Sequence, residues 1–168
     1  MSSIAILNAL PADAAREALH ACCPSARWSR EMAARRPFSS ASALIAAGTS
    51  LLDGMADAEL VEVISRHDPI GADAGDGRLT SRWSRREQSG VLGEGVAIRA
   101  EFAELNRQYR ERFGYVYLVC ATGRSAADIR DDLVHRLHQD EAVELRTARA
   151  ELRKIVELRL GRILEAVR

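Results

Sequence analysis

The sequence predicts an all-α fold, a single-domain helical bundle of about seven to eight helices with one short extended segment near residues 116–121. Most segments repeat their apolar residues at the three- and four-residue spacing of a helix, with Ser, Asp, Gly or Pro at their ends. Only one run is β-prone. The 168 residues, 47% of them apolar, can bury one core and are too few for two domains, so we expect one domain over residues 1–168.

Three predicted helices fill the first part of the chain. The first follows Asp13, which we expect to cap it, and ends before Pro24. The second follows Ser25 as its cap and ends at residues 35–38. The third covers residues 42–52 and is strongly apolar. Together these helices predict a core of packed helices in this part of the protein.

A fourth predicted helix has Asp57 as its cap and ends in a histidine. Ile64 and His67 lie about one turn apart and share one apolar face. Pro69 disfavours helical backbone at the residue before it, and Gly71 permits a sharp turn, so the helix should stop at His67. The imidazole is therefore expected at a helix C-terminus, at the edge of an apolar face.

A polar loop rich in Gly and Asp follows, and then a short predicted helix over residues 79–89 that Gly90 ends. On this helix Ser84, Glu87 and Gln88 lie at i, i+3 and i+4, so they share one face. Two successive helices are therefore predicted to present polar groups from the edges of apolar faces.

The second half of the chain contains the β-prone run. A long helix ends at Gly114, and residues 115–120 then read as a strand. A single extended segment has no partner strand, so its backbone N–H and C=O groups need other partners, some of which a small polar ligand could supply. Ser125 is expected to cap the helix that follows.

The last predicted helix runs from about residue 141 to the end of the chain and places an arginine in its apolar stripe. Arg159 stands where the period calls for an apolar residue. A guanidinium at such a position needs an anion or several carbonyls as partners. It could bind a ligand, pair with a core carboxylate or extend its head group to water.

The composition excludes several classes of protein. The 24 basic and 24 acidic residues give no net charge, so no field favours nucleic acid or an anionic membrane. No apolar run is long enough to span a bilayer, and the first residues lack the features of a secretory signal, so we expect a cytoplasmic protein. The three cysteines lack metal-ligand spacing, and we expect reduced and mostly buried thiols.

The candidate residues each have a structural alternative. His67 could be a catalyst, a hydrogen-bonded structural residue or a positive charge at a helix C-terminus. Ser84, Glu87 and Gln88 could equally lie on a solvated helix surface. Cys120 could act as a nucleophile, although the sequence shows no activating neighbour. The four histidines show no metal-binding pattern.

Taken together, several segments resemble the 2-oxo-4-hydroxy-4-carboxy-5-ureidoimidazoline (OHCU) decarboxylases of urate degradation. The resemblance covers essentially the whole chain and rests on the order and spacing of its motifs. These are CCPSARW at 22–28, RPF at 36–38, HDPIG at 67–71, WSRREQ at 83–88, FAELNRQY at 102–109, FGY at 113–115 and VCATGRS at 119–125, with Arg159-Leu160 in the last helix.

The resemblance implies an all-helical homodimer that needs no metal or organic cofactor and converts OHCU to (S)-allantoin and CO2. In this reading His67 and Glu87 are catalytic residues. The other residues that the resemblance assigns contact the substrate: Ser84, Gln88, Val119, Cys120, Ala121, Thr122 and Arg159. Decarboxylation leaves electrons on a ring carbon next to a carbonyl, which can hold them as an enolate without a cofactor.

One position departs from the family pattern. The family has a proline directly after the histidine, whereas this chain reads His67-Asp68-Pro69. A carboxylate at this place could raise the basicity of the imidazole or change the turn that orients it. The sequence therefore leaves an alternative open, a non-catalytic helical protein that binds a ureide or serves in assembly and has lost the activity.

Overall fold

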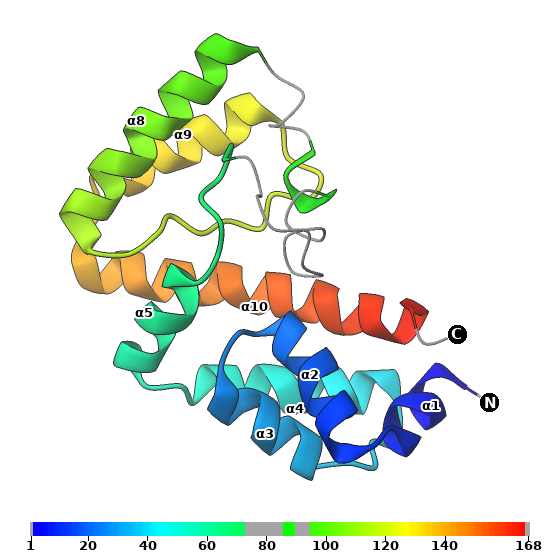
Figure 1. The fold of residues 1–168 in the computed structure, drawn as a ribbon. Helices are drawn as coiled ribbons and strands as arrows, with labels where there is room; N and C mark the ends of the chain where they lie inside the picture. Colours follow the sequence, from blue (N-terminus) through cyan, green and yellow to red (C-terminus); the bar gives the residue numbers. More distant parts are fainter. Residues whose placement is uncertain (1, 73–85, 90–94, 167–168) are drawn as a thin grey trace. The chain divides into compact units, whose positions relative to one another are not determined.

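The computed structural model describes residues 2–72, 86–89 and 95–166, and within these ranges the chain forms eight α-helices and no strand. This confirms the all-α prediction (Figure 1). The chain forms two compact units. Met1–Glu59 with Arg153–Arg168 is called the terminal unit below, and Leu60–Leu152 the central unit. The sequence predicts that they belong to one domain, and this stays a prediction.

The terminal unit contains the first four helices of the chain. They are α1 (Ser3–Ala9), α2 (Ala12–Cys22), α3 (Ala26–Ala34) and α4 (Ala41–Asp53). The first turn of α5 (Asp57–Ser65) and the second half of α10 (Glu141–Ala166) also belong to this unit. The unit boundaries therefore fall within two helices.

The core of the terminal unit is packed around a glycine of α4. A Cβ at Gly48 would lie only 2.8 Å from Cδ1 of Leu160 and 3.0 Å from the ring of Trp28. The Trp28 Nε1–H donates to the carbonyl of the same glycine at 2.9 Å. Helices can approach this closely only where a side chain is absent, so Gly48 sets the packing distance here.

Helix α1 was not predicted, and contacts from distant residues explain why it forms. The Arg36 guanidinium donates to the carbonyls of Leu7, Asn8 and Leu10 at 2.7–3.3 Å and so supplies partners at the C-terminal end of the helix. The Asn8 side chain also pairs with both backbone polar groups of Phe38 at 2.9 Å. A helix of seven residues that depends on such contacts has little signal in its own sequence.

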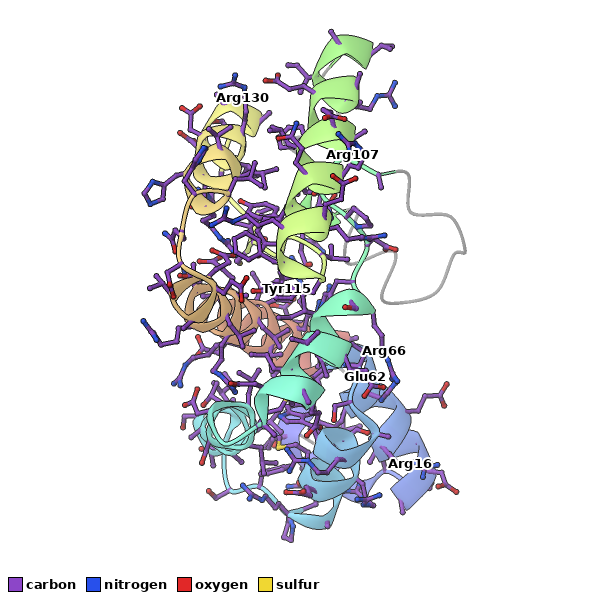
Figure 2. All side chains as sticks on the ribbon, turned by 90° about the vertical axis from the view of Figure 1, so that its left-hand side faces the viewer. Arg16, Glu62, Arg66, Arg107, Tyr115 and Arg130 are labelled. Atoms are coloured by element: carbon purple, nitrogen blue, oxygen red, sulfur yellow. The ribbon has the colours of Figure 1, made fainter. Side chains whose placement is uncertain are left out.

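The central unit is built on α8 (Val96–Phe113), α9 (Ala126–Arg136) and the first half of α10. Gly114 ends α8 with a φ of 79°, as the sequence predicts. Residues 116–121 have no regular secondary structure. Arg107, labelled on α8 in Figure 2, is half-exposed. It forms ion pairs with Glu104 and Glu111 of the same helix at 2.6 and 2.5 Å.

Four aromatic residues of the central unit form one cluster: Tyr109, Phe113, Tyr115 and Tyr117. The ring of Tyr109 lies 5.8 Å from that of Tyr115 and 5.4 Å from that of Tyr117, with an interplanar angle of 77° in both pairs. Phe113 packs 4.7 Å from Tyr109. Edge-to-face pairs of this kind favour one arrangement of the rings over others. The cluster thus anchors the residues that follow α8.

The predicted helix caps at Ser25 and Ser125 are confirmed, whereas the predicted caps Asp13 and Asp57 both lie within the first turn of their helices. Ser25 accepts a hydrogen bond from the Trp28 N–H, and Ser125 forms a capping box with Asp128. Asp13 does not cap α2, because the helix begins at Ala12 and Asp13 lies in its first turn. A carboxylate there still favours the positive end of the helix dipole.

The free cysteines agree with the prediction, since Cys22 and Cys23 are buried and Cys120 is half-buried. Burial raises the pKa of the Cys23 thiol to about 12. In the part of the chain that the structure describes, every helix is too short or too polar to cross a membrane.

Candidate functional site

His67 lies just beyond the end of α5. The helix ends at Ser65 rather than at His67 as predicted, although the His67 backbone N–H still donates to the Ile64 carbonyl at 3.0 Å. The imidazole Nδ1 lies 3.0 Å from the Val63 carbonyl oxygen. Because a carbonyl only accepts, Nδ1 must carry a proton, and proton exchange with a substrate would fall to the buried Nε2.

A tight turn follows the histidine. The Ala72 N–H donates to the Pro69 carbonyl at 3.1 Å, and Gly71 has a φ of 77°. Asn106 of α8 donates from Nδ2 to the Ile70 carbonyl at 2.9 Å. The predicted sharp turn at the glycine is confirmed, and a side chain that the sequence analysis did not single out holds it.

Glu87 and Gln88 lie in the short described segment 86–89. The Glu87 side chain is buried, with 8% exposure. Gln88 accepts a hydrogen bond from the Gly71 N–H at 3.0 Å, so it lies against the turn that follows His67. Ser84, and the rest of the predicted helix before residue 86, lie outside the described residues.

The predicted substrate loop, residues 119–122, has Val119 and Ala121 buried and Thr122 exposed. The Cys120 N–H donates to Oε2 of Glu151 at 2.8 Å. One backbone donor of this loop is therefore occupied by a carboxylate of α10. The isolated extended segment predicts that its backbone groups have partners of this kind, but no pattern in the sequence singles out Glu151.

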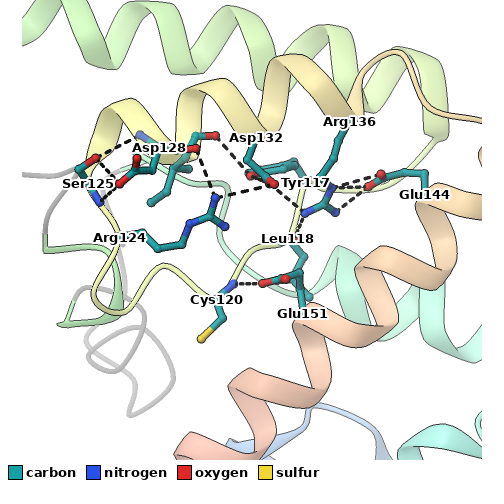
Figure 3. A network of polar contacts seen from close by, with 11 residues as sticks. Tyr117, Leu118, Cys120, Arg124, Ser125, Asp128, Asp132, Arg136, Glu144 and Glu151 are labelled. Atoms are coloured by element: carbon teal, nitrogen blue, oxygen red, sulfur yellow. Dashed lines mark hydrogen bonds and ion pairs between the residues drawn. The ribbon is translucent and has the colours of Figure 1, made fainter.

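A buried polar network holds the preceding residues (Figure 3). Arg136 of α9 donates to the Leu118 carbonyl at 2.9 Å and to the Glu144 carboxylate at 2.6 and 2.9 Å. Tyr109 donates to the same carboxylate, and Arg136 lies 4.6 Å from the centre of the Tyr117 ring. Arg136 is 1% exposed and Glu144 is 0% exposed. Three helices and the irregular segment are thus joined through one ion pair.

Tyr109, Tyr117 and Arg136 keep their ordinary protonation states in this network. Burial and the hydrogen bond to Glu144 both raise the pKa of Tyr109, and burial with Asp132 raises that of Tyr117. Burial alone would lower the pKa of Arg136, but its hydrogen bonds to Glu144 raise it. A neutral phenol and a charged guanidinium at all ordinary pH values make this network structural rather than a proton relay.

Arg159 is buried in the second half of α10, with 2% exposure, and belongs to the terminal unit. The prediction that a charged residue interrupts the apolar stripe of this helix is confirmed, since Ile155 and Ile163 on the same face are also buried. Its approach to the candidate residues of the central unit stays a prediction.

A signal in the sequence could have found Arg136. Ile129, Leu133 and Arg136 follow the same period on α9 that identified Arg159 on α10, and all three are buried. Asn106 and Glu151 have no such signal, because half-exposed or isolated polar residues on a helix usually face solvent.

Within residues 2–72, 86–89 and 95–166, no three His, Cys, Asp or Glu side chains are grouped so that they could hold a metal ion. His135 and His138 are exposed on α9 and just after it.

The fold and these side chains define a class of protein, namely an all-helical protein with candidate acid–base groups next to a hydrogen-bonded turn. Residues 8–161 match the family model described as OHCU decarboxylase. The chain is 36% identical over 150 residues to a human protein named putative 2-oxo-4-hydroxy-4-carboxy-5-ureidoimidazoline decarboxylase, covering 86% of this chain and 83% of that one. This chain belongs to the OHCU decarboxylase family.

Two further comparisons agree. A crystal structure of OHCU decarboxylase in the presence of (S)-allantoin matches with a TM-score of 0.75 and 26% identity, covering 87% of this chain and 96% of the other. The bifunctional uric acid degradation protein TTL of Arabidopsis thaliana is 30% identical over 84% of this chain. The present chain spans only 45% of the length of that plant protein.

Proposed function

We propose that this protein catalyses the decarboxylation of OHCU to (S)-allantoin and CO2 in the degradation of urate. Membership of the OHCU decarboxylase family supports the reaction. The observation that carries the proposal for the site is the imidazole of His67, whose Nδ1–H is bound to the Val63 carbonyl so that Nε2 serves for proton transfer.

In the proposed reaction the bond between the carboxylate carbon and the ring carbon breaks, and CO2 leaves. The electron pair of that bond stays on the ring carbon and is delocalised into the adjacent carbonyl as an enolate. His67, in its imidazolium form with both ring nitrogens protonated, then delivers the Nε2 proton to the same carbon and is left as the neutral ring with its proton on Nδ1. Delivery from one face produces a single hand of allantoin, and a positioned acid of this kind contributes about 10²- to 10⁴-fold in rate.

The remaining candidate residues bind and orient the substrate in this proposal. Glu87 offers a buried carboxylate that can accept from ring N–H or hydroxyl groups. Gln88 uses its Oε1 for the Gly71 N–H, so its Nε2 is the end proposed to donate to the substrate. Ser84 and Arg159 are proposed as a hydroxyl and a guanidinium contact.

The loop of residues 119–122 is proposed to supply backbone donors to the enolate oxygen. The contact between the Cys120 N–H and Glu151 limits which donors can serve. Among the described residues, the N–H groups of Ala121 and Thr122 make no hydrogen bond with the protein, and we assign the enolate contact to this pair. Val119 and Cys120 then contribute through carbonyl and side-chain contacts.

The decisive experiment generates OHCU in situ from urate and follows the appearance of optically active allantoin by circular dichroism. We expect the wild-type chain to accelerate this signal and the His67→Asn variant to return it to the spontaneous rate. His138→Asn is a matched control, because the exposed His138 makes the same Nδ1 contact with the carbonyl four residues earlier, at 2.8 Å. Its activity should equal that of the wild type.

The His67-Asp68-Pro69 sequence favours a second candidate, a ureide-binding protein without activity. That protein would bind allantoin in a calorimetric titration but leave the rate and handedness of allantoin formation unchanged. Acceleration by the wild-type chain excludes this alternative.

We further propose a homodimer that acts in the cytoplasm. Cys22 and Cys23 are both buried and form no disulfide among the described residues, which suits a reducing compartment. Light scattering coupled to size-exclusion chromatography tests the dimer, since a mass of one chain at micromolar concentration would contradict it. Fractionation of cells that express the tagged chain tests the compartment.

A further inference from the structure

The peptide group between Ile70 and Gly71 is held at both ends by side chains from other segments. Its carbonyl oxygen accepts from Nδ2 of Asn106 at 2.9 Å, and its N–H donates to Oε1 of Gln88 at 3.0 Å. A trans peptide directs its C=O and N–H in opposite directions, so the two side-chain amides form hydrogen bonds with opposite edges of the same peptide plane.

This peptide is the centre of a type II β-turn. The turn is closed by the bond from the Ala72 N–H to the Pro69 carbonyl, and Gly71 at its third position has a φ of 77°. Type I and type II turns differ chiefly in the rotation of this central peptide. Rotation would set the carbonyl of Ile70 against the Gln88 oxygen and lose both bonds, so the two amides select type II.

The side-chain amide of Asn106 has an orientation that is energetically unfavourable when considered alone. Only its Nδ2 can donate to the Ile70 carbonyl, which fixes the orientation of the side-chain amide. Its Oδ1 is then buried and has no hydrogen-bond partner among the described residues. An unpaired buried acceptor is unfavourable. The hydrogen bond that Nδ2 of Asn106 donates must therefore contribute more than the unpaired oxygen costs.

The turn connects two candidate catalytic groups. It begins two residues after His67, whose backbone N–H and Nδ1 are both held by the last turn of α5. Glu87 directly precedes Gln88 in the chain. The Ile70–Gly71 peptide therefore links the segment that carries the His67 imidazole to the segment that carries the Glu87 carboxylate.

We infer that Asn106 is a positioning residue, which acts through the Ile70–Gly71 peptide to keep His67 and Glu87 in register. This inference rests on the proposed function. Small errors in such a register are expensive in rate, because a misplacement of about 1 Å can cost about 100-fold. Asn106 should therefore affect turnover and product handedness more than substrate affinity.

The test replaces Asn106 by Asp, which keeps the size of the side chain but turns the donor into an acceptor. We expect kcat to fall about 10- to 100-fold. The excess of (S)-allantoin should fall with it, while KM stays within about twofold. Gln108→Glu is the matched control, since it makes the same change of amide to carboxylate at an exposed position of α8 and should leave activity unchanged.

A second variant reaches the same turn from the other side. Gly71→Ala disfavours the positive φ and so favours rotation of the central peptide. Its loss in kcat should resemble that of Asn106→Asp, and the double variant should lose little more than either alone, because both changes release one structure. Hydrogen exchange of the Gly71 N–H should be faster in Asn106→Asp than in the wild type.

The outcomes separate the two proposals. A wild-type chain that does not accelerate allantoin formation overturns the proposed function and this inference with it. An active wild type with Asn106→Asp at wild-type kcat and handedness overturns the positioning role alone. Additive losses in the double variant, or a fall in Tm with a rise in KM and no change in handedness, also overturn it, because they indicate a general structural role.

Discussion

The two compact units bury their centres in different ways. The terminal unit closes around Gly48 with apolar side chains, among them Trp28 and Leu160. The central unit buries a charged pair, Arg136 and Glu144, at 1% and 0% exposure. Each arrangement is stable only when complete: close packing around Gly48 in the terminal unit, which also buries Arg159, and the Arg136–Glu144 pair in the central unit.

The reason for the difference is the irregular segment after α8. A helix satisfies its own backbone, whereas residues 116–121 have no such ladder. Side chains must then supply the partners, and Arg136 does so for the Leu118 carbonyl while Glu151 does so for the Cys120 N–H. A helical protein that needs one non-helical segment near a candidate site therefore needs buried polar residues to hold it.

The largest expected effect comes from breaking the buried pair. Arg136→Met leaves the Glu144 carboxylate without its cation and the Leu118 carbonyl without its donor. We expect a loss of about 3–5 kcal/mol in the free energy of unfolding, measured by urea denaturation.

Two controls sharpen this prediction. Replacing both members, Arg136→Met with Glu144→Leu, removes the orphaned charge and should recover a large part of the loss. Arg130→Met breaks an exposed ion pair with Glu101 and should change stability by less than about 1 kcal/mol. Equal losses in Arg136→Met and Arg130→Met would contradict the difference between the buried and exposed pairs.

An intermediate effect is expected from overfilling the terminal unit. The Cβ of Gly48→Ala would meet Leu160 at 2.8 Å, so side chains of the core must shift. We expect a loss of about 1–3 kcal/mol in the free energy of unfolding.

Gly161→Ala is the matched control for that variant. This glycine lies within α10, and an added Cβ would have no atom within 4 Å. Alanine should therefore stabilise the helix by about 0.5–1 kcal/mol. A destabilised Gly161→Ala or a neutral Gly48→Ala would show that close packing does not control this unit.

The smallest effect concerns a carboxylate at the edge of the terminal unit. Glu59 accepts from the Ser25 hydroxyl at 2.6 Å and from Arg27 at 2.8 Å. Partial burial would raise the pKa of Glu59, but these hydrogen bonds outweigh it and lower the pKa below the ordinary value of 4.5. The folded state thus favours the charged form.

A lowered pKa in the folded state gives stability that is present above the ordinary pKa and lost as the pH falls below it. We expect Glu59→Gln to be about 0.5 kcal/mol less stable than the wild type at pH 7, since Arg27 is partly exposed. The difference should shrink below about pH 4 in chemical denaturation at a series of pH values. A difference that is constant from pH 7 to pH 3 would contradict the role of the charge.

Much of the fold follows from local sequence. Ser25, Ser125 and Gly114 each act within four residues of their own position, and the helix ends they predict are confirmed. The helix that local sequence does not predict depends on distant residues. α1 depends on Arg36, which comes 26 residues or more after the carbonyls it bonds. No local pattern contains that information.

The candidate site is predictable to a lesser degree. The sequence predicts a helix end at His67, and α5 ends two residues earlier, at Ser65. The position of Arg159 within a buried stripe of α10 is confirmed. Spacing alone does not show that Gln88 contacts Gly71 or that Glu151 contacts Cys120, because these bonds join residues 17 and 31 positions apart. The catalytic roles stay predictions.

The aromatic cluster around Tyr109 also makes the central unit optically distinct. All three tyrosines of the chain lie in this cluster, at fixed edge-to-face angles. Asymmetrically held phenols give a near-ultraviolet circular dichroism band, whereas freely rotating ones do not. The tyrosine band is thus a native, label-free signal for the integrity of the segment that joins α8 to α9.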